Sequence, residues 1–209
     1  AYIGSDAGGG TIILKTGLLP GPASMLLNDG KVGSTGNVTL TATNGDITQS
    51  PSGAIIANAL TATAKTGINL QSGYNQVTSF KATNNTSGPI VFNNNGLFSL
   101  KDTTNYDINP TGTITITGND TINQTGNVIT AGGDIVVDAT NSIIMTSGKK
   151  AQTSGGLISY STLYEDITLG LLDAGTTGIV SVIAGGNIKD GNGTSNNIKA
   201  QVASLVAGN

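Results

Sequence analysis

The residues with the clearest chemical potential are carboxylates, and the pair Glu165–Asp166 contains the only glutamate of the chain. Glycosidases use two carboxyl groups roughly 5 to 10 Å apart that converge on one bond. Lyases instead need a base placed to remove a proton. Neighbouring residues on a strand point to opposite faces, so this pair would not converge. We therefore expect no polysaccharide-cleaving site and interpret the pair as part of a solvated turn.

Oxygen-bearing side chains alternate with other residues between Asp190 and Asn196, as they do at the start of a calcium loop. Position twelve of such a loop would be Gln201, where the site needs a bidentate glutamate. The run Gly132-Gly133-Asp134 resembles one unit of a calcium-binding nonapeptide repeat, but it does not recur. We expect both segments to be turns and expect no metal or cofactor.

Amide and aromatic side chains raise a second possibility, a carbohydrate-binding groove on the surface. Its members would be Asn93, Asn94, Asn95, Tyr74, Tyr106, Tyr160 and Tyr164. The alternative interpretation is structural, because asparagine stacks in ladders at the corners of repetitive folds and tyrosine closes turns. We favour the structural interpretation.

Rows of threonine raise a third possibility, since flat Thr-x-Thr arrays occur in some ice-binding proteins. The candidates are Thr39, Thr41, Thr43, Thr61, Thr63, Thr113, Thr115 and Thr117. Lys81 and Lys101 interrupt the row, and threonine is also common on the wet face of a strand. An ordinary solvated face is therefore the simpler interpretation.

The composition excludes many function classes. The chain of 209 residues has no His, Cys, Trp or Arg, so zinc, copper and iron sites and the Cys and Ser-His nucleophiles lack their members. The chain has nine lysines and twelve carboxylates, so it lacks the excess of positive charge that binding to nucleic-acid phosphates requires. No run approaches the length of a membrane span.

The elements that carry these residues are predicted to be short strands. Gly, Thr, Asn and Ser make up close to half of the chain, and these residues are weak helix formers. Val38, Leu40 and Ala42 alternate with threonines, which predicts a strand with one buried face. Glycine and asparagine punctuate the strands, as turns require. The sequence therefore predicts an all-β fold.

A period near 20 residues organises the strands. Leu40-Thr41-Ala42-Thr43 is followed at intervals of 20 by three similar segments that begin at Leu60, Phe80 and Leu100, and looser copies begin at Val137 and Val182. A second apolar position follows the first four segments. It is occupied by Ile47, Ile68, Ile90 and Ile108. The unit therefore reads as a strand, a glycine turn and a second strand.

A constant period favours a coiled solenoid over an antiparallel sandwich, because like residues then stack from turn to turn. The sequence predicts a β-solenoid with about 20 residues per turn, in which residues 1–35 form irregular or N-terminal turns and residues 36–209 form the repeat region. Its core ladder would consist of Leu40, Leu60, Phe80, Leu100, Ala42, Ala62, Ala82, Ile47, Ile68 and Ile90.

The repeats resemble those of filamentous haemagglutinin-like giant adhesins, which are exoproteins of Gram-negative bacteria exported by two-partner secretion. The resemblance lies in Thr39–Ile47 (TLTATNGDI), in Ala184–Gly193 (AGGNIKDGNG) and in Asn197–Gln201 (NIKAQ) with the Leu205–Gly208 segment that follows. It implies a right-handed parallel β-helix, a secreted or cell-surface location, and a role in adhesion or as a stalk.

Together these observations predict a rigid, non-enzymatic segment of a cell-surface adhesin. Its partners would be adjacent repeats of the same polypeptide or neighbouring copies of the chain, and glycans or proteins of a host or the environment. The alternatives are an extracellular filament subunit that assembles through its ends, a β-helix that binds or cleaves polysaccharide, and an ice-binding solenoid.

Overall fold

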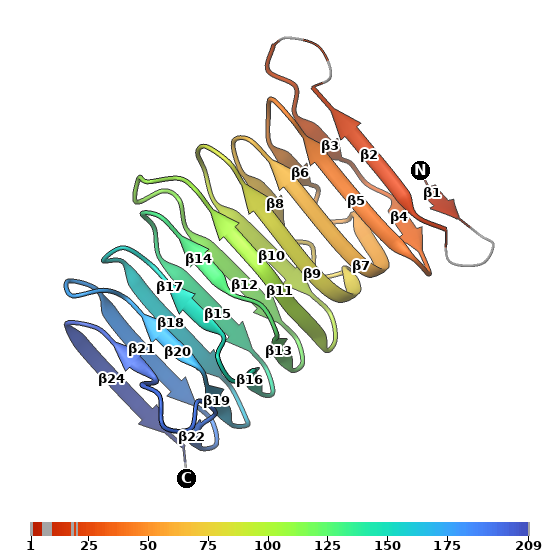
Figure 1. The fold of residues 1–209 in the computed structure, drawn as a ribbon. Coiled ribbons are helices and arrows are strands. Elements are labelled where there is room, and N and C mark those ends of the chain that lie inside the picture. Colours follow the sequence, from red (N-terminus) through yellow and green to blue (C-terminus); the bar gives the residue numbers. More distant parts are fainter. Residues whose placement is uncertain (1, 6–9, 18, 20, 209) are drawn as a thin grey trace.

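The strands wind into a parallel β-solenoid of about nine turns, about 22 residues apart. The computed structural model describes residues 2–5, 10–17, 19 and 21–208, and these contain strands and no helix. Every strand pair in this part of the chain is parallel, and the turns stack from the N-terminal β1 to the C-terminal β24 (Figure 1). This confirms the predicted all-β solenoid.

Each turn contributes to three ladders of parallel strands, which we name the first, second and third ladder in chain order. The first ladder contains β1 (Tyr2–Ser5), β4 (Lys31–Ser34), β7 (Ala54–Ala64), β9 (Gln76–Asn84), β11 (Phe98–Asn105), β13 (Ile122–Gln124), β16 (Ile143–Met145), β19 (Ile167–Leu169) and β22 (Ile188–Asp190). The second contains β2 (Ile12–Thr16), β5 (Asn37–Ala42), the long strands β7, β9 and β11 again, β14 (Val128–Thr130), β17 (Lys150–Gln152), β20 (Leu171–Asp173) and β23 (Ile198–Lys199).

The third ladder forms a separate nine-stranded sheet. It contains β3 (Met25–Leu27), β6 (Ile47–Gln49), β8 (Ile68–Leu70), β10 (Ile90–Asn94), β12 (Ile114–Gly118), β15 (Ile135–Ala139), β18 (Leu157–Thr162), β21 (Ile179–Ala184) and β24 (Val202–Ala207). The predicted unit of two strands is therefore wrong, since a turn has three. At about 4.8 Å per turn, nine turns make a rod on the order of 40 Å long.

The residues 1–35 also carry strands of the solenoid. β1 pairs with β4, β2 with β5 and β3 with β6, each in parallel. Residues 1, 6–9, 18 and 20 of this segment lie outside the described residues. The predicted N-terminal turns thus take the same form as the repeat region in the part that the structure describes.

Columns of like side chains fill the interior. Ile47, Ile68 and Ile90 pair in succession, and the column continues through Ile114, Ile135 and Ile158. Ile108, the predicted fourth member, is 79% exposed in a loop, so that assignment is wrong. All ten predicted ladder residues are buried. The rings of Phe80 and Phe92 stack at 3.8 Å between centroids and join columns of different ladders.

The predicted register is wrong at Leu40. Leu60, Phe80 and Leu100 pair in succession, but Leu60 lies beside Val38, and Leu40 lies beside Ala62. A shift of two residues leaves every side chain on its own face of the strand. The alternation in the sequence is therefore compatible with both registers, and only the length of the intervening loops distinguishes them.

A β-bulge accounts for the irregular fourth copy. Leu100 pairs with Phe80, but Thr103 rather than Asp102 pairs with Ala82. The extra residue keeps the Asp102 carboxylate outside, where it accepts a hydrogen bond from the Asn127 backbone. An unpaired carboxylate in the Ala82 column would cost several kcal/mol, on the order of its lost hydration. The looser copies at Val137 and Val182 are also misaligned, because both residues belong to the third ladder.

Candidate interaction surface

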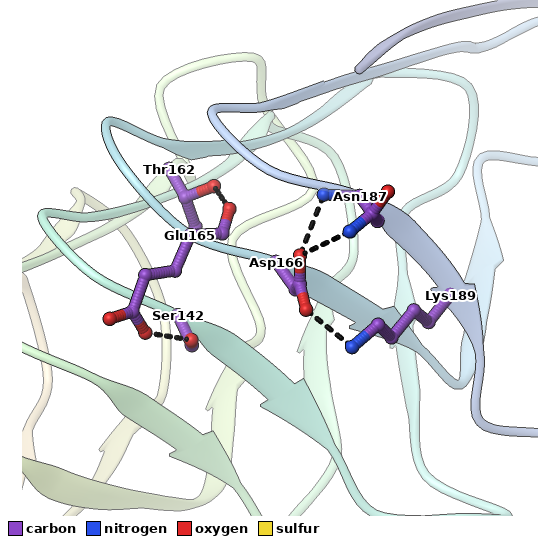
Figure 2. Close-up of polar contacts among 6 residues, drawn as sticks. All are labelled: Ser142, Thr162, Glu165, Asp166, Asn187 and Lys189. Carbon is purple, nitrogen blue, oxygen red and sulfur yellow. Dashed lines mark hydrogen bonds and ion pairs between the residues drawn. The ribbon is translucent and has the colours of Figure 1, made fainter. Parts of the chain in front are cut away.

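The Glu165–Asp166 pair ties adjacent turns together. Figure 2 shows the two carboxylates turned away from one another: Glu165 accepts from the Ser142 hydroxyl at 2.7 Å, in the preceding turn, and Asp166 accepts from the Asn187 backbone at 2.7 Å, in the following turn. Asp166 also forms an ion pair with Lys189. The hydrogen bond from Lys189, with that from the Asn187 backbone, lowers the pKa of Asp166 to about 2. The predicted turn is the arrangement observed.

The two segments with calcium-like spacing also use their oxygens within the fold. Asp190 accepts from the Asn192 backbone at 2.7 Å and from the Asn197 amide at 3.0 Å, and the bond to Asn192 is the largest cause of its lowered pKa. Asp134 accepts from the Leu157 backbone of the next turn at 2.7 Å. In the described part of the chain, no group of three or more acidic side chains gathers as a metal site would require.

The tyrosines and asparagines that were considered for a carbohydrate-binding groove do not lie together. Tyr160 is fully buried, so its assignment to the surface is wrong. Asn94 is also buried, and its amide donates to the backbone oxygens of Val77 and Gly96. Tyr106 follows the second ladder and Tyr164 the third, so they lie at different corners. The solenoid separates these side chains because each corner belongs to a different part of the turn.

The threonine rows are divided between two ladders. Thr39 pairs with Thr61 in the second ladder, and Thr61 is followed by Lys81. Thr115 lies in the third ladder, between Val91 and Val136. The candidate threonines therefore do not form one continuous column.

Buried amides tie the corner between the second and third ladders. Asn84 accepts from the Gly67 backbone at 2.9 Å and donates to the Asn105 side chain at 3.0 Å and to two carbonyls of its own loop. In later turns the Thr130 and Thr153 hydroxyls take over, donating to the oxygens of Gly112 and Gly133. These bonds satisfy corner backbone groups that would otherwise be buried without a partner.

A second set of buried amides ties the corner between the third and first ladders. Gln49 and Asn75 exchange hydrogen bonds of 2.8 and 3.0 Å. The Asn75 side chain also bonds the backbones of Leu70, Asn93 and Ile55. One side chain thus connects three successive turns, which fixes the path of the corner.

Asp107 is a fully buried carboxylate that the sequence reasoning missed. Burial by itself would raise its pKa, but hydrogen bonds from Asn109, the Gly88 backbone and Thr111 outweigh burial and lower the pKa. Its acceptor atoms are occupied by the loop that follows β11 and by the preceding turn. The sequence does contain a pattern that could have indicated its role. Asp107 and Asn109 precede Pro110 with the spacing that is typical of an aspartate-initiated turn.

Two of the open hollows on the described surface lie between turns of the rod. One, of about 410 Å³, crosses the ends of four strands of the third ladder and contains Thr117, Asp138 and Ser161. The other, of about 600 Å³, lies near the N-terminal end and is lined by Gly30, Lys31, Ser52, Ala54 and Tyr74. Tyr74, which sequence reasoning linked to sugars, borders the second of these hollows.

Comparison with known proteins identifies one relationship. The family model described as "Hemagglutinin repeat" matches residues 99–209, which is more than half of the chain. The comparisons with curated proteins and with solved structures found no match. Among the described residues, no helix is long and apolar enough to span a membrane.

Proposed function

Because the chain belongs to the hemagglutinin repeat family, we propose that it is a rigid, non-enzymatic segment of a secreted or cell-surface bacterial adhesin, which holds other parts of the adhesin away from the cell and presents its own side as a display surface. The family and the solenoid fold both fit an adhesin-type segment. A rod built from stacked turns resists bending because every interior strand is hydrogen-bonded to the turn above and the turn below.

The observation that carries the proposal is the unbroken parallel pairing from β1 to β24. Three sets of buried polar side chains reinforce it, at the Asn84, Asn75 and Gln124 positions of the three corners. The outer surface has a low charge and few aromatic residues, which suits a shaft with few contacts of its own.

Electron microscopy of the purified chain tests the proposal. The expected result is a population of short rods of uniform length, on the order of 40 Å, at all protein concentrations. Protease treatment of intact producing cells provides the test of location, and the expected result is loss of the segment without lysis. Retention of the segment inside the cell membrane would contradict a surface role.

A second candidate is a filament subunit, in which a turn supplied by another copy would pair with β24. β24 pairs with β21 on one side only, and the core-facing Leu205 is 48% exposed. A further turn of the same kind would cover Leu205 and pair with β24, and it could come from a longer polypeptide or from another copy. Fibres whose length grows with protein concentration would favour assembly from separate copies.

A further inference from the structure

The hollow beside Tyr74 combines an exposed aromatic ring with hydrogen-bonding groups. It spans the second, third and fourth turns at the corner between the third and first ladders, and its volume of about 600 Å³ suits a small ligand. Lys31 and Ala54 are paired residues of β4 and β7, and Tyr74 lies one turn further along the rod.

The small side chain of Ala54 lines the hollow together with the longer side chains of Lys31 and Tyr74. Along the rod, Ala54 belongs to the turn between those of Lys31 and Tyr74. Two turn spacings separate Lys31 from Tyr74, or roughly 10 Å along the rod. This space accommodates one six-membered ring laid against the tyrosine.

The side chain of Tyr74 is exposed to solvent, but hydrogen bonds of its neighbours hold the turn that carries it. Tyr74 is 63% exposed, whereas Ser72 and Asn75 on either side are 2% and 0% exposed. The Ser72 hydroxyl donates to the Pro51 oxygen at 2.9 Å and accepts from the Tyr74 backbone at 3.3 Å. Asn75 is anchored to the Leu70 oxygen at 3.1 Å. Because the turn is already fixed in the unbound chain, its backbone loses little freedom when a ligand covers the tyrosine.

We propose that this hollow binds one pyranose ring of a glycan. The C–H face of the sugar would lie on the Tyr74 ring, and its oxygens would accept from the Lys31 ammonium and exchange hydrogen bonds with the Ser52 hydroxyl. Lys31 has another interaction within the structure, but an ammonium carries three donors, so a sugar oxygen can share it.

The lining fits two other common ligands less well. A nucleobase site would use stacking platforms for successive bases along a positively charged groove, and the hollow has one ring and one cation. A phosphate site would use several converging donors, such as a backbone nest or a bidentate arginine, and the chain has no arginine. A pyranose has both an apolar face and a polar rim, which matches a single ring beside hydroxyl and ammonium donors.

This inference rests on the proposed display role and extends it, because it places one ligand site on the side of the rod. The two fail separately: rod shape in electron microscopy tests the shaft, and sugar binding tests the hollow. A uniform rod that binds no sugar would leave the shaft intact and overturn the site.

Binding is tested on an array of neutral and acidic pyranose glycans, followed by titration calorimetry with the strongest hit. The expected result is that at least one glycan binds, that Tyr74→Ala lowers its affinity at least tenfold, and that Tyr164→Ala changes it less than twofold. Tyr164 is the matched control. It also follows a strand of the third ladder and is 65% exposed, but it does not line the hollow. Absence of any bound glycan, or equal effects of the two variants, would overturn the proposal.

A second variant tests the hollow without removing the ring. Ala54→Phe fills the hollow and is expected to abolish binding, and Thr168→Phe, at an outward position of the first ladder, is expected to preserve it. Circular dichroism verifies that both variants keep the β fold. If folded Ala54→Phe binds the glycan as well as the unmodified chain, the sugar does not occupy this hollow.

Discussion

The Tyr160 hydroxyl donates a 2.6 Å hydrogen bond to the side-chain oxygen of Gln124 in the interior of the rod. The Gln124 amide in turn donates to the backbone oxygens of Gly126 and Lys150. A residue of the third ladder is thus joined to the corner between the first and second ladders. The bond crosses the core and connects parts of the solenoid that no strand pairing joins.

Removing this hydroxyl should destabilise the rod although the ring remains. In Tyr160→Phe the Gln124 oxygen is left buried without its donor, and the expected loss is about 1–3 kcal/mol in the free energy of unfolding. Urea denaturation measures it. Tyr74→Phe is the control, because that hydroxyl belongs to an exposed side chain, and it should leave the unfolding midpoint unchanged.

Alkaline stability should depend on the same residue. Burial raises the pKa of Tyr160 well above its value in an unfolded chain. A group with a raised folded pKa contributes stability below the unfolded pKa of about 10 and loses it as the pH rises further. Stability should therefore fall above about pH 10 in the unmodified chain and fall less steeply in Tyr160→Phe. Parallel pH profiles for both proteins would contradict this assignment.

Two neighbouring asparagines should differ sharply in their contribution to stability. Asn84 is fully buried and serves several backbone groups, whereas Asn85 is exposed. Asn84→Ala leaves the Gly67 donor and loop carbonyls unsatisfied, and the expected cost is about 3 kcal/mol. Asn85→Ala is expected to fall within about 0.5 kcal/mol of the unmodified chain. Thermal unfolding of the two variants measures the difference, and equal melting temperatures would exclude the amide ladder as a stabilising feature.

Alanine substitutions at two glycines should separate the cost of backbone strain from the cost of a clash between stacked turns. Gly88 and Gly96 both have positive φ, of 85° and 120°. A Cβ on Gly88 would lie 2.5 Å from the Thr66 oxygen of the preceding turn, whereas one on Gly96 would meet nothing within 4 Å. Gly96→Ala should cost about 1–2 kcal/mol through strain alone. Gly88→Ala should cost clearly more in the same denaturation experiment, because the turns must move apart.

The Asp166 carboxyl should titrate at low pH because of its ties to the next turn. Its pKa of about 2 is due first to the hydrogen bond from Lys189 and then to that from the Asn187 backbone. A lowered folded pKa contributes stability above the unfolded value and loses it as the pH falls toward 2. Carboxyl NMR titration should show the Asp166 midpoint rising in Lys189→Met, while that of Asp190 stays unchanged. A midpoint that does not move would exclude the lysine as the cause.

In the sequence, alternation of apolar and polar residues predicted the strands, glycine and asparagine predicted the turns, and the period near 20 residues predicted the solenoid. The inward direction of Leu40, Leu60 and Phe80 follows from that alternation because side chains on a strand have a period of two. The asparagine ladders were also foreseen in kind, since corners of stacked turns need amides to satisfy buried backbone groups.

Only the tertiary structure decided the register, the ladder of each strand and the outward or inward direction of corner residues. Leu40 lies beside Ala62 rather than Leu60, because a shift of two residues is invisible to a pattern with period two. Val137 belongs to the third ladder. The sequence could not show this, because strands of all three ladders have the same alternation of apolar and polar residues. Tyr160 points inward because it occupies an inward position of β18, two residues after Ile158, whereas Tyr74 lies in the turn before β9 and is exposed.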